Sequence, residues 1–119
     1  EIMGRKINVF DRNLGDGSLT KRGEIPVNSG PDNLEWDESG NLWFAGHPRL
    51  LAFAGHAENA ENISPSQVIK IDVKVNPPIV SEIYMNLGDE ISASSVAAVS
   101  GDVMLIGSVF EKHILRCKL

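Results

Sequence analysis

Cysteine is almost absent from this sequence: the 119 residues include one, Cys117, near the C-terminus. A lone cysteine can form neither an internal disulfide nor a thiolate metal site. Cys117 is therefore either a buried free thiol or the partner of a cysteine in a missing N-terminal part of the protein. These alternatives leave the redox compartment open.

Long hydrophobic runs are missing too. No stretch approaches the roughly 18 apolar residues that span a bilayer, so we expect no transmembrane segment. Residues 1–6 are too polar and too short for a signal peptide. Because the chain begins at Glu1 rather than at methionine, we expect either a processed chain or a piece of a longer protein.

Clusters of positive charge and the common catalytic motifs are also lacking. The formal net charge is −5, with acidic and basic residues interspersed, which argues against a nucleic-acid partner. The sequence has no Gly-x-Ser-x-Gly elbow, no phosphate loop and no zinc-ligand spacing, so hydrolysis through a covalent serine intermediate is disfavoured. Its 42% hydrophobic and 23% charged content is typical of a soluble globular protein.

What the sequence does contain is a series of short strands separated by turn signals, without sustained helical periodicity. Asp16-Gly17 predicts a hairpin turn, because glycine accepts positive φ. Segment 42–46 is apolar throughout, so we expect burial on both of its faces. Segment 56–64 is interpreted as a polar loop. The predicted strands are 6–12, 19–25, 34–37, 42–46, 50–54, 67–73, 79–85, 95–99, 103–109 and 114–118.

One seven-residue pattern occurs twice. Residues 40–46 read Gly-Asn-Leu-Trp-Phe-Ala-Gly, and residues 101–107, 61 positions further on, read Gly-Asp-Val-Met-Leu-Ile-Gly. A turn followed by a buried strand, recurring at this scale, is typical of β-propeller blades, whose period is roughly 40–50 residues. The loops around 56–64 and 86–92 account for the longer period here.

Propeller blades have four antiparallel strands, which suggests how these strands are grouped. We predict that 6–25 end one blade, 32–85 form a full blade and 94–118 give the first three strands of the last blade. The fold class is then all-β, a single partial propeller domain over residues 1–119 with about two and a half blades. Its uncovered faces and edges predict the remaining blades as partners.

Three groups of residues together resemble the paraoxonase/arylesterase family. They are Gly-Pro-Asp-Asn-Leu-Glu-Trp-Asp at 30–37 with 40–48 after it, Ser-Gln-Val-Ile-Lys-Ile at 66–71, and the end of the chain at 105–113 and 117–119. They follow the family's order at about its spacing. The resemblance implies the C-terminal portion of a six-bladed propeller with two calcium ions in its central tunnel, one structural and one at the floor of the active site.

The resemblance also implies an activity. The family hydrolyses lactones, aryl esters and sometimes organophosphate triesters, so we expect a calcium-dependent hydrolase with a small-molecule lactone or ester as substrate. One alternative is another propeller enzyme, of gluconolactonase-like or strictosidine-synthase-like type. The other is a non-catalytic propeller that binds proteins.

Asp32 and Asn33 carry the metal prediction. Calcium takes six to eight oxygen ligands, including carboxylate and amide oxygens. Neighbouring side chains on a strand point in opposite directions, so both can reach one ion only where the backbone turns, and Gly30-Pro31 supplies such an irregularity. An ordinary Asx turn is the alternative. The resemblance implies that the pair contributes two ligands to the catalytic calcium, with the others upstream.

The histidines differ in what they predict. His47, in Gly-His-Pro, could shuttle protons or hold a substrate oxygen, and the resemblance places it close to the active-site cavity. A histidine that caps a strand end is the alternative. His56 and His113 match no motif and are expected on the surface. Val109 and Phe110 match a stretch that walls the family's substrate pocket, although ordinary blade core is an equal alternative.

The remaining expectations concern covalent links and the core. Cys117 matches the family's C-terminal cysteine, which is bridged to one near the N-terminus; such a bridge favours a secreted or periplasmic protein. Asn62-Ile63-Ser64 is a glycosylation sequon weakened by the proline after it. Trp36 and Trp43 are expected in the core.

Overall fold

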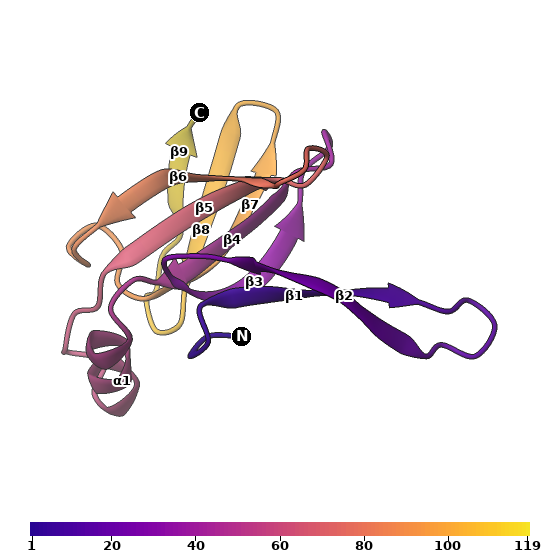
Figure 1. Cartoon of the computed structure of the whole chain (residues 1–119). Coiled ribbons are helices and arrows are strands. Elements are labelled where there is room, and N and C mark those ends of the chain that lie inside the picture. The colour runs from indigo at the N-terminus through magenta and orange to yellow at the C-terminus, as the bar shows by residue number, and fades with distance from the viewer.

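The computed structural model describes all residues, 1–119, as nine β-strands and one helix (Figure 1). The chain is all-β apart from that helix, as predicted. The helix is too short and not apolar enough to cross a membrane. The elements in chain order are β1 Lys6–Arg12, β2 Leu19–Pro26, β3 Gly30–Trp36, β4 Leu42–His47, α1 Leu50–Glu58, β5 Ser66–Asp72, β6 Ile79–Asn86, β7 Ser94–Ser100, β8 Val103–Ser108 and β9 Leu115–Lys118.

The strands form three antiparallel sheets. The first is the hairpin β1-β2, the second has the order β3-β4-β5-β6, and the third has the order β7-β8-β9. Figure 1 shows the hairpin extending away from the other two sheets as a long arm. Strands β3 and β4 pack against β7, so the second and third sheets meet along these strands. The assembly of such sheets into blades of a ring stays a prediction.

Strand β4 lies at the centre of the core and is buried at every residue, which confirms the two-faced burial predicted for 42–46. Successive side chains on a strand point to opposite faces. Leu42 and Phe44 therefore join a cluster with Ile69 of β5 and residues of the first hairpin, whereas Trp43 and Ala45 join a cluster with residues of the third sheet. Both neighbouring sheets thus depend on β4 for their apolar contacts.

The two copies of the sequence repeat adopt the same local structure. Gly40 and Gly101 have φ values of 76° and 57° in the β3–β4 and β7–β8 turns, a region that glycine adopts without the steric cost of a Cβ. In both hairpins the first strand carries a register shift, between Pro31 and Leu34 in β3 and between Ser94 and Val96 in β7. The repeat is therefore a bulged strand, a glycine turn and a second strand, which is buried throughout in β4 but only at Met104 and Ile106 in β8.

The predicted strand at 50–54 is wrong, because these residues begin helix α1. Leucine and alanine are strong helix formers, and they supply five of the nine residues of α1: Leu50, Leu51, Ala52, Ala54 and Ala57. No β-branched residue occurs in the helix to favour a strand. The polar loop is correspondingly shorter than predicted and begins after Glu58.

Only one of the two tryptophans lies in the core. Trp43 is 3% exposed, whereas Trp36 is 63% exposed, so the core prediction for Trp36 is wrong. Trp36 lies at the end of β3, on a groove of about 1060 Å³ between the β1-β2 hairpin and the second sheet. Phe10 and Val80 line the same groove and are also exposed. The apolar side chains on this face are therefore left exposed to solvent in this chain.

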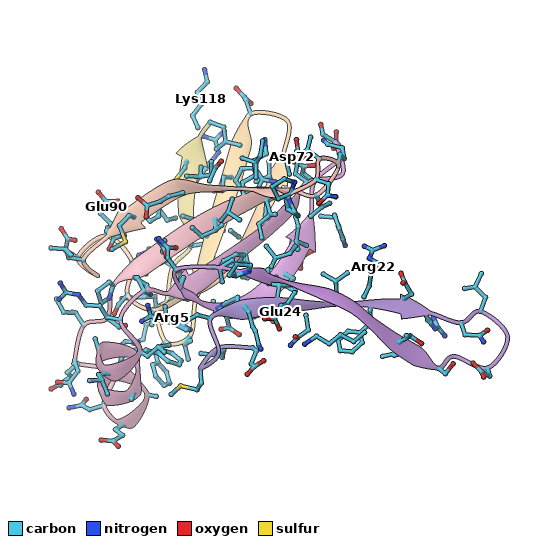
Figure 2. The ribbon with its side chains drawn as sticks, viewed as in Figure 1. Arg5, Arg22, Glu24, Asp72, Glu90 and Lys118 are labelled. Atoms are coloured by element: carbon cyan, nitrogen blue, oxygen red, sulfur yellow. The ribbon has the colours of Figure 1, made fainter.

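Two polar anchors hold the turns around β4. Arg5, labelled in Figure 2, donates from its guanidinium to the carbonyl oxygen of Pro48 at 3.2 Å, which ties the start of the chain to the segment after β4. Asp37 accepts hydrogen bonds from the backbone of Ser39, from the backbone and side chain of Asn41, and from Nε1 of Trp43, at 2.8–2.9 Å. The Asp37 carboxylate thus fixes both the β3–β4 turn and the buried indole.

We expect Asp37 to stabilise the fold in a pH-dependent way. Burial acts to raise the pKa of Asp37, but the hydrogen bonds from Trp43, Asn41 and Ser39 outweigh it and lower the pKa from 3.8 to about 2. A lowered pKa stabilises the folded state above pH 3.8, and this contribution is lost as the pH falls toward 2. Asp37→Ala in the full-length protein should cost about 1–3 kcal/mol of unfolding free energy at pH 7, by urea denaturation.

Asp37→Asn is the matched control, because it keeps an acceptor oxygen and removes the charge. Its deficit relative to the wild type should be full at pH 7 and should shrink between about pH 4 and pH 2. Equal urea midpoints for wild type and Asp37→Ala at pH 7 would show that this carboxylate does not anchor the turn.

Candidate functional site

Asp32 and Asn33 lie in the bulge of β3. Pro31 pairs with Gly46 and Leu34 pairs with Phe44, so β3 has one residue more than β4 between these pairs. A bulge bends its strand and redirects side chains. The backbone irregularity that the metal prediction needs is therefore present, and ligation itself stays a prediction.

Asn33 connects the bulge to the third sheet. Its Nδ2 donates a hydrogen bond of 3.0 Å to the backbone oxygen of Ser95, which lies at the register shift of β7. This bond orients the amide and leaves Oδ1 as its free acceptor. Asp32 is partly exposed beside it. The two bulges thus meet, and the site lies where the second and third sheets are in contact.

His47 lies behind Asp32 in the interior. It ends β4, pairs with Gly30 and is fully buried. Its Nε2 is 3.7 Å from Oδ2 of Asp32, which is longer than a good hydrogen bond, and neither ring nitrogen has a hydrogen-bond partner. Burial lowers the pKa of His47, the Asp32 carboxylate opposes that shift, and His56 adds to it. The imidazole is therefore neutral at neutral pH.

Helix α1 covers His47. The ring of Phe53 stacks on the imidazole with centroids 3.5 Å apart and an interplanar angle of 10°. Sequence reasoning missed this contact because it assigned 50–54 to a strand. Figure 1 shows α1 beside the ends of β4 and β5, where it follows β4 directly.

His56 is buried, so the prediction that it lies on the surface is wrong. It follows Phe53 by three residues and therefore lies on the same face of α1. Its Nδ1 is 2.5 Å from the backbone oxygen of Asn62; since a carbonyl only accepts, Nδ1 carries the proton. The ring is also tilted against Phe110, with centroids 5.2 Å apart. The i, i+3 spacing of two rings in a leucine- and alanine-rich segment was the available signal.

The other predicted residues lie further from this cluster. Val109 and Phe110 are 43% and 47% exposed, so neither belongs to the core of this chain, and Phe110 reaches the cluster through His56. His113 is exposed, as predicted. Cys117 is a half-buried free thiol; burial raises its pKa and Glu90 adds to that shift. With one cysteine in the chain, the disulfide stays a prediction.

The metal-binding capacity of the chain is partial. Asp32 and Asn33 offer carboxylate and amide oxygens, the donor types that calcium prefers. Nowhere in the structure do three or more His, Cys, Asp or Glu side chains gather closely enough to hold a metal ion. Calcium needs six to eight oxygens, so these two fit as part of a coordination shell. The large groove near Trp36 includes neither Asp32 nor His47 and is a separate feature.

Comparison of the sequence with known proteins identifies its relatives. Human serum paraoxonase/arylesterase 1 is 31% identical over 121 residues, which cover 100% of this chain and 33% of the relative. Human serum paraoxonase/lactonase 3 is 30% identical with the same coverage. Mechanosensory abnormality protein 6 of Caenorhabditis elegans is 38% identical over 87 residues, covering 69% of this chain and 23% of the relative.

The chain thus spans 33% of the length of the two paraoxonases and 23% of the length of Mechanosensory abnormality protein 6. The family model named Arylesterase matches residues 1–119, the whole chain, which confirms the resemblance to the paraoxonase/arylesterase family. The chain belongs to the arylesterase family.

Proposed function

We propose that the full-length protein is a calcium-dependent hydrolase of lactones and aryl esters, and that this chain contributes two calcium ligands, Asp32 and Asn33. The observation that carries the proposal is the bulge of β3, which puts a carboxylate and an oriented amide side by side with a buried histidine behind them. The names of the relatives, arylesterase and lactonase, support the reaction class.

The residues of this chain have distinct roles in the proposal. A bound calcium would act as a Lewis acid toward the ester or lactone carbonyl and stabilise its oxyanion. Asp32 and Asn33 hold the ion. His47, neutral and without a hydrogen bond that fixes its tautomer, is suited to pass a proton or hold a substrate oxygen. Phe110 and Val109 wall the substrate side. The base that activates water and the remaining ligands lie in other parts of the protein.

Two other functions fit the same scaffold. A related propeller enzyme, gluconolactonase-like or strictosidine-synthase-like, would share the scaffold and differ in the ligands from other blades. A non-catalytic binding scaffold is the second; one relative, Mechanosensory abnormality protein 6, is named without a reaction. Metal content together with esterase activity separates the three functions.

The test is an assay of the purified full-length protein on phenyl acetate and on a lactone, together with elemental analysis. We expect bound calcium, hydrolysis of both substrates, loss of activity after chelation and recovery when calcium is added back. Bound calcium without esterase or lactonase activity would favour a related enzyme. Absence of both calcium and activity would favour the binding scaffold and remove the proposal.

Cys117 supports a separate proposal about compartment. We propose a disulfide between Cys117 and a cysteine in another part of the protein, which favours a secreted or periplasmic location. The half-buried thiol near the C-terminus is consistent with such a link. Mass spectrometry of the non-reduced full-length protein should find a cross-linked peptide that contains Cys117; a free thiol throughout would contradict the link.

A further inference from the structure

His47 lacks the interaction that usually orients a histidine in a catalytic or metal site. Such a ring ordinarily donates one N–H to a carboxylate, carbonyl or water, which fixes both its tautomer and its plane. Here neither Nδ1 nor Nε2 has a hydrogen-bond partner, and the approach to Asp32 is 3.7 Å. Another contact has to hold the ring.

Phe53 makes that contact. Its ring lies nearly parallel to the imidazole, at 3.5 Å between centroids and 10° between planes. A stack of this kind restricts rotation of the imidazole out of its plane, since rotation would lose the ring–ring contact on one whole face. The plane of the ring decides whether the edge of the ring that carries Nε2 can face the Asp32 carboxylate.

The position of Phe53 is itself fixed by the far end of its helix. The Nδ1–H of His56 donates to the backbone oxygen of Asn62 at 2.5 Å, and the side chain of Asn62 donates to the backbone oxygen of Gly55 at 3.1 Å. This reciprocal pair fastens the C-terminal turn of α1 to the following loop. A nine-residue helix has little stability of its own, so these contacts matter for where Phe53 is held.

We propose that Phe53 is a positioning residue for this site: its stacked ring holds the plane of the His47 imidazole, so that the Nε2 edge lies toward Oδ2 of Asp32, in place of the missing hydrogen bond. The role rests on the proposed function, because the effect on hydrolysis passes through His47 and Asp32. Phe53 is assigned no contact with substrate.

The test compares three variants of the full-length protein. Phe53→Leu keeps an apolar side chain and favours the helix but removes the flat ring. Phe53→Tyr keeps the ring and serves as the conservative rescue. Leu51→Ala, at a residue that is 90% exposed on the same helix, is the matched control. For each we measure kcat and KM on phenyl acetate, the melting temperature, and the ring-proton chemical shifts of His47 by NMR.

We expect Phe53→Leu to lower kcat by roughly 3- to 10-fold with KM unchanged, the size expected when an aromatic pair is lost. Phe53→Tyr and Leu51→Ala should stay close to the wild type. The His47 ring protons should lie upfield in the wild type, because of the ring current of Phe53, and should move downfield in Phe53→Leu alone. A Phe53→Leu protein with wild-type kcat, or one altered only in KM, would overturn the positioning role.

The NMR measurement separates this inference from the proposed function. If the wild type hydrolyses neither substrate, the hydrolase proposal fails, and the positioning claim is then decided by the His47 shifts and by calcium affinity from calorimetry. Shifts that move and affinity that weakens in Phe53→Leu support the claim. Shifts identical in Phe53→Leu and wild type overturn it, and so does an unchanged calcium affinity, because loss of the Phe53 ring current moves the shifts even when the imidazole keeps its plane.

Discussion

Replacing Asp32 by alanine is expected to abolish lactone and ester hydrolysis by the full-length protein, with a fall in kcat/KM of about 100-fold or more. Asp32 is the one carboxylate in the β3 bulge, and its partner Asn33 offers a neutral amide oxygen. Removing it takes away the formal charge that this chain brings to the ion. Chelation of calcium from the wild type should reduce activity to the same level.

Matched substitutions sharpen this prediction. Asp32→Asn keeps an oxygen donor and should lose less, with partial recovery at raised calcium concentration, whereas Asp32→Ala should not recover. Asp102→Ala removes the same charge from an exposed turn and should keep wild-type activity. Calorimetry should show weakened calcium binding for the Asp32 variants and wild-type binding for Asp102→Ala. Full hydrolytic activity in Asp32→Ala would remove the central claim about this site.

The second large effect concerns the chain on its own. We expect the isolated 119-residue chain to aggregate or to stay poorly folded, without a cooperative thermal transition by circular dichroism. The groove between the hairpin and the second sheet is lined by exposed apolar side chains, among them Phe10 and Trp36, and β1 keeps an unpaired edge. Uncovered apolar faces and open strand edges favour association between chains.

Paired substitutions distinguish this explanation from general instability. Phe10→Lys with Trp36→Lys should reduce aggregation of the isolated chain, because charge on an exposed face opposes association. In the full-length protein the same pair should lower the melting temperature, because the groove is then expected to be covered by further blades. A monomeric isolated chain that melts cooperatively would contradict both the prediction and the partial-ring interpretation.

Much of the fold could be predicted from local pattern. Eight of the nine strands lie within one residue of the bounds predicted from the alternation of apolar residues, whereas β3 begins at Gly30 and not at the predicted Leu34, because Gly30 and Pro31 also pair with β4 ahead of the bulge. The 61-residue repeat identified two hairpins that share a glycine turn and a bulge. Helix α1 was missed because a nine-residue segment with two buried or half-buried rings gives a weak periodic signal. Its leucine and alanine content, without β-branched residues, was the better guide. Trp36 could not be assigned, since its exposure depends on which sheet covers β3.

The candidate site also has one feature that local sequence predicts and two that only tertiary packing determines. The irregular backbone at Asp32 and Asn33 could be expected from the neighbouring Gly30-Pro31, which is a local feature. The stack of Phe53 on His47 and the burial of His56 depend on how α1 packs back onto the end of β4, and no local pattern encodes that. Tertiary packing therefore decided both corrections.

The hydrogen bond from Asn33 to Ser95 makes the candidate site sensitive to mechanics as well as to chemistry. The Asn33 side chain in the β3 bulge is hydrogen-bonded to the neighbouring sheet, so the orientation of its amide depends on the angle between the two sheets. A twist of β7 relative to β3 would turn the amide of Asn33 and leave Asp32 where it is. Substitutions in the contact between β3 and β7 should then change the orientation of the Asn33 amide without touching a ligand. Residues of this contact should therefore be constrained by the geometry of the site.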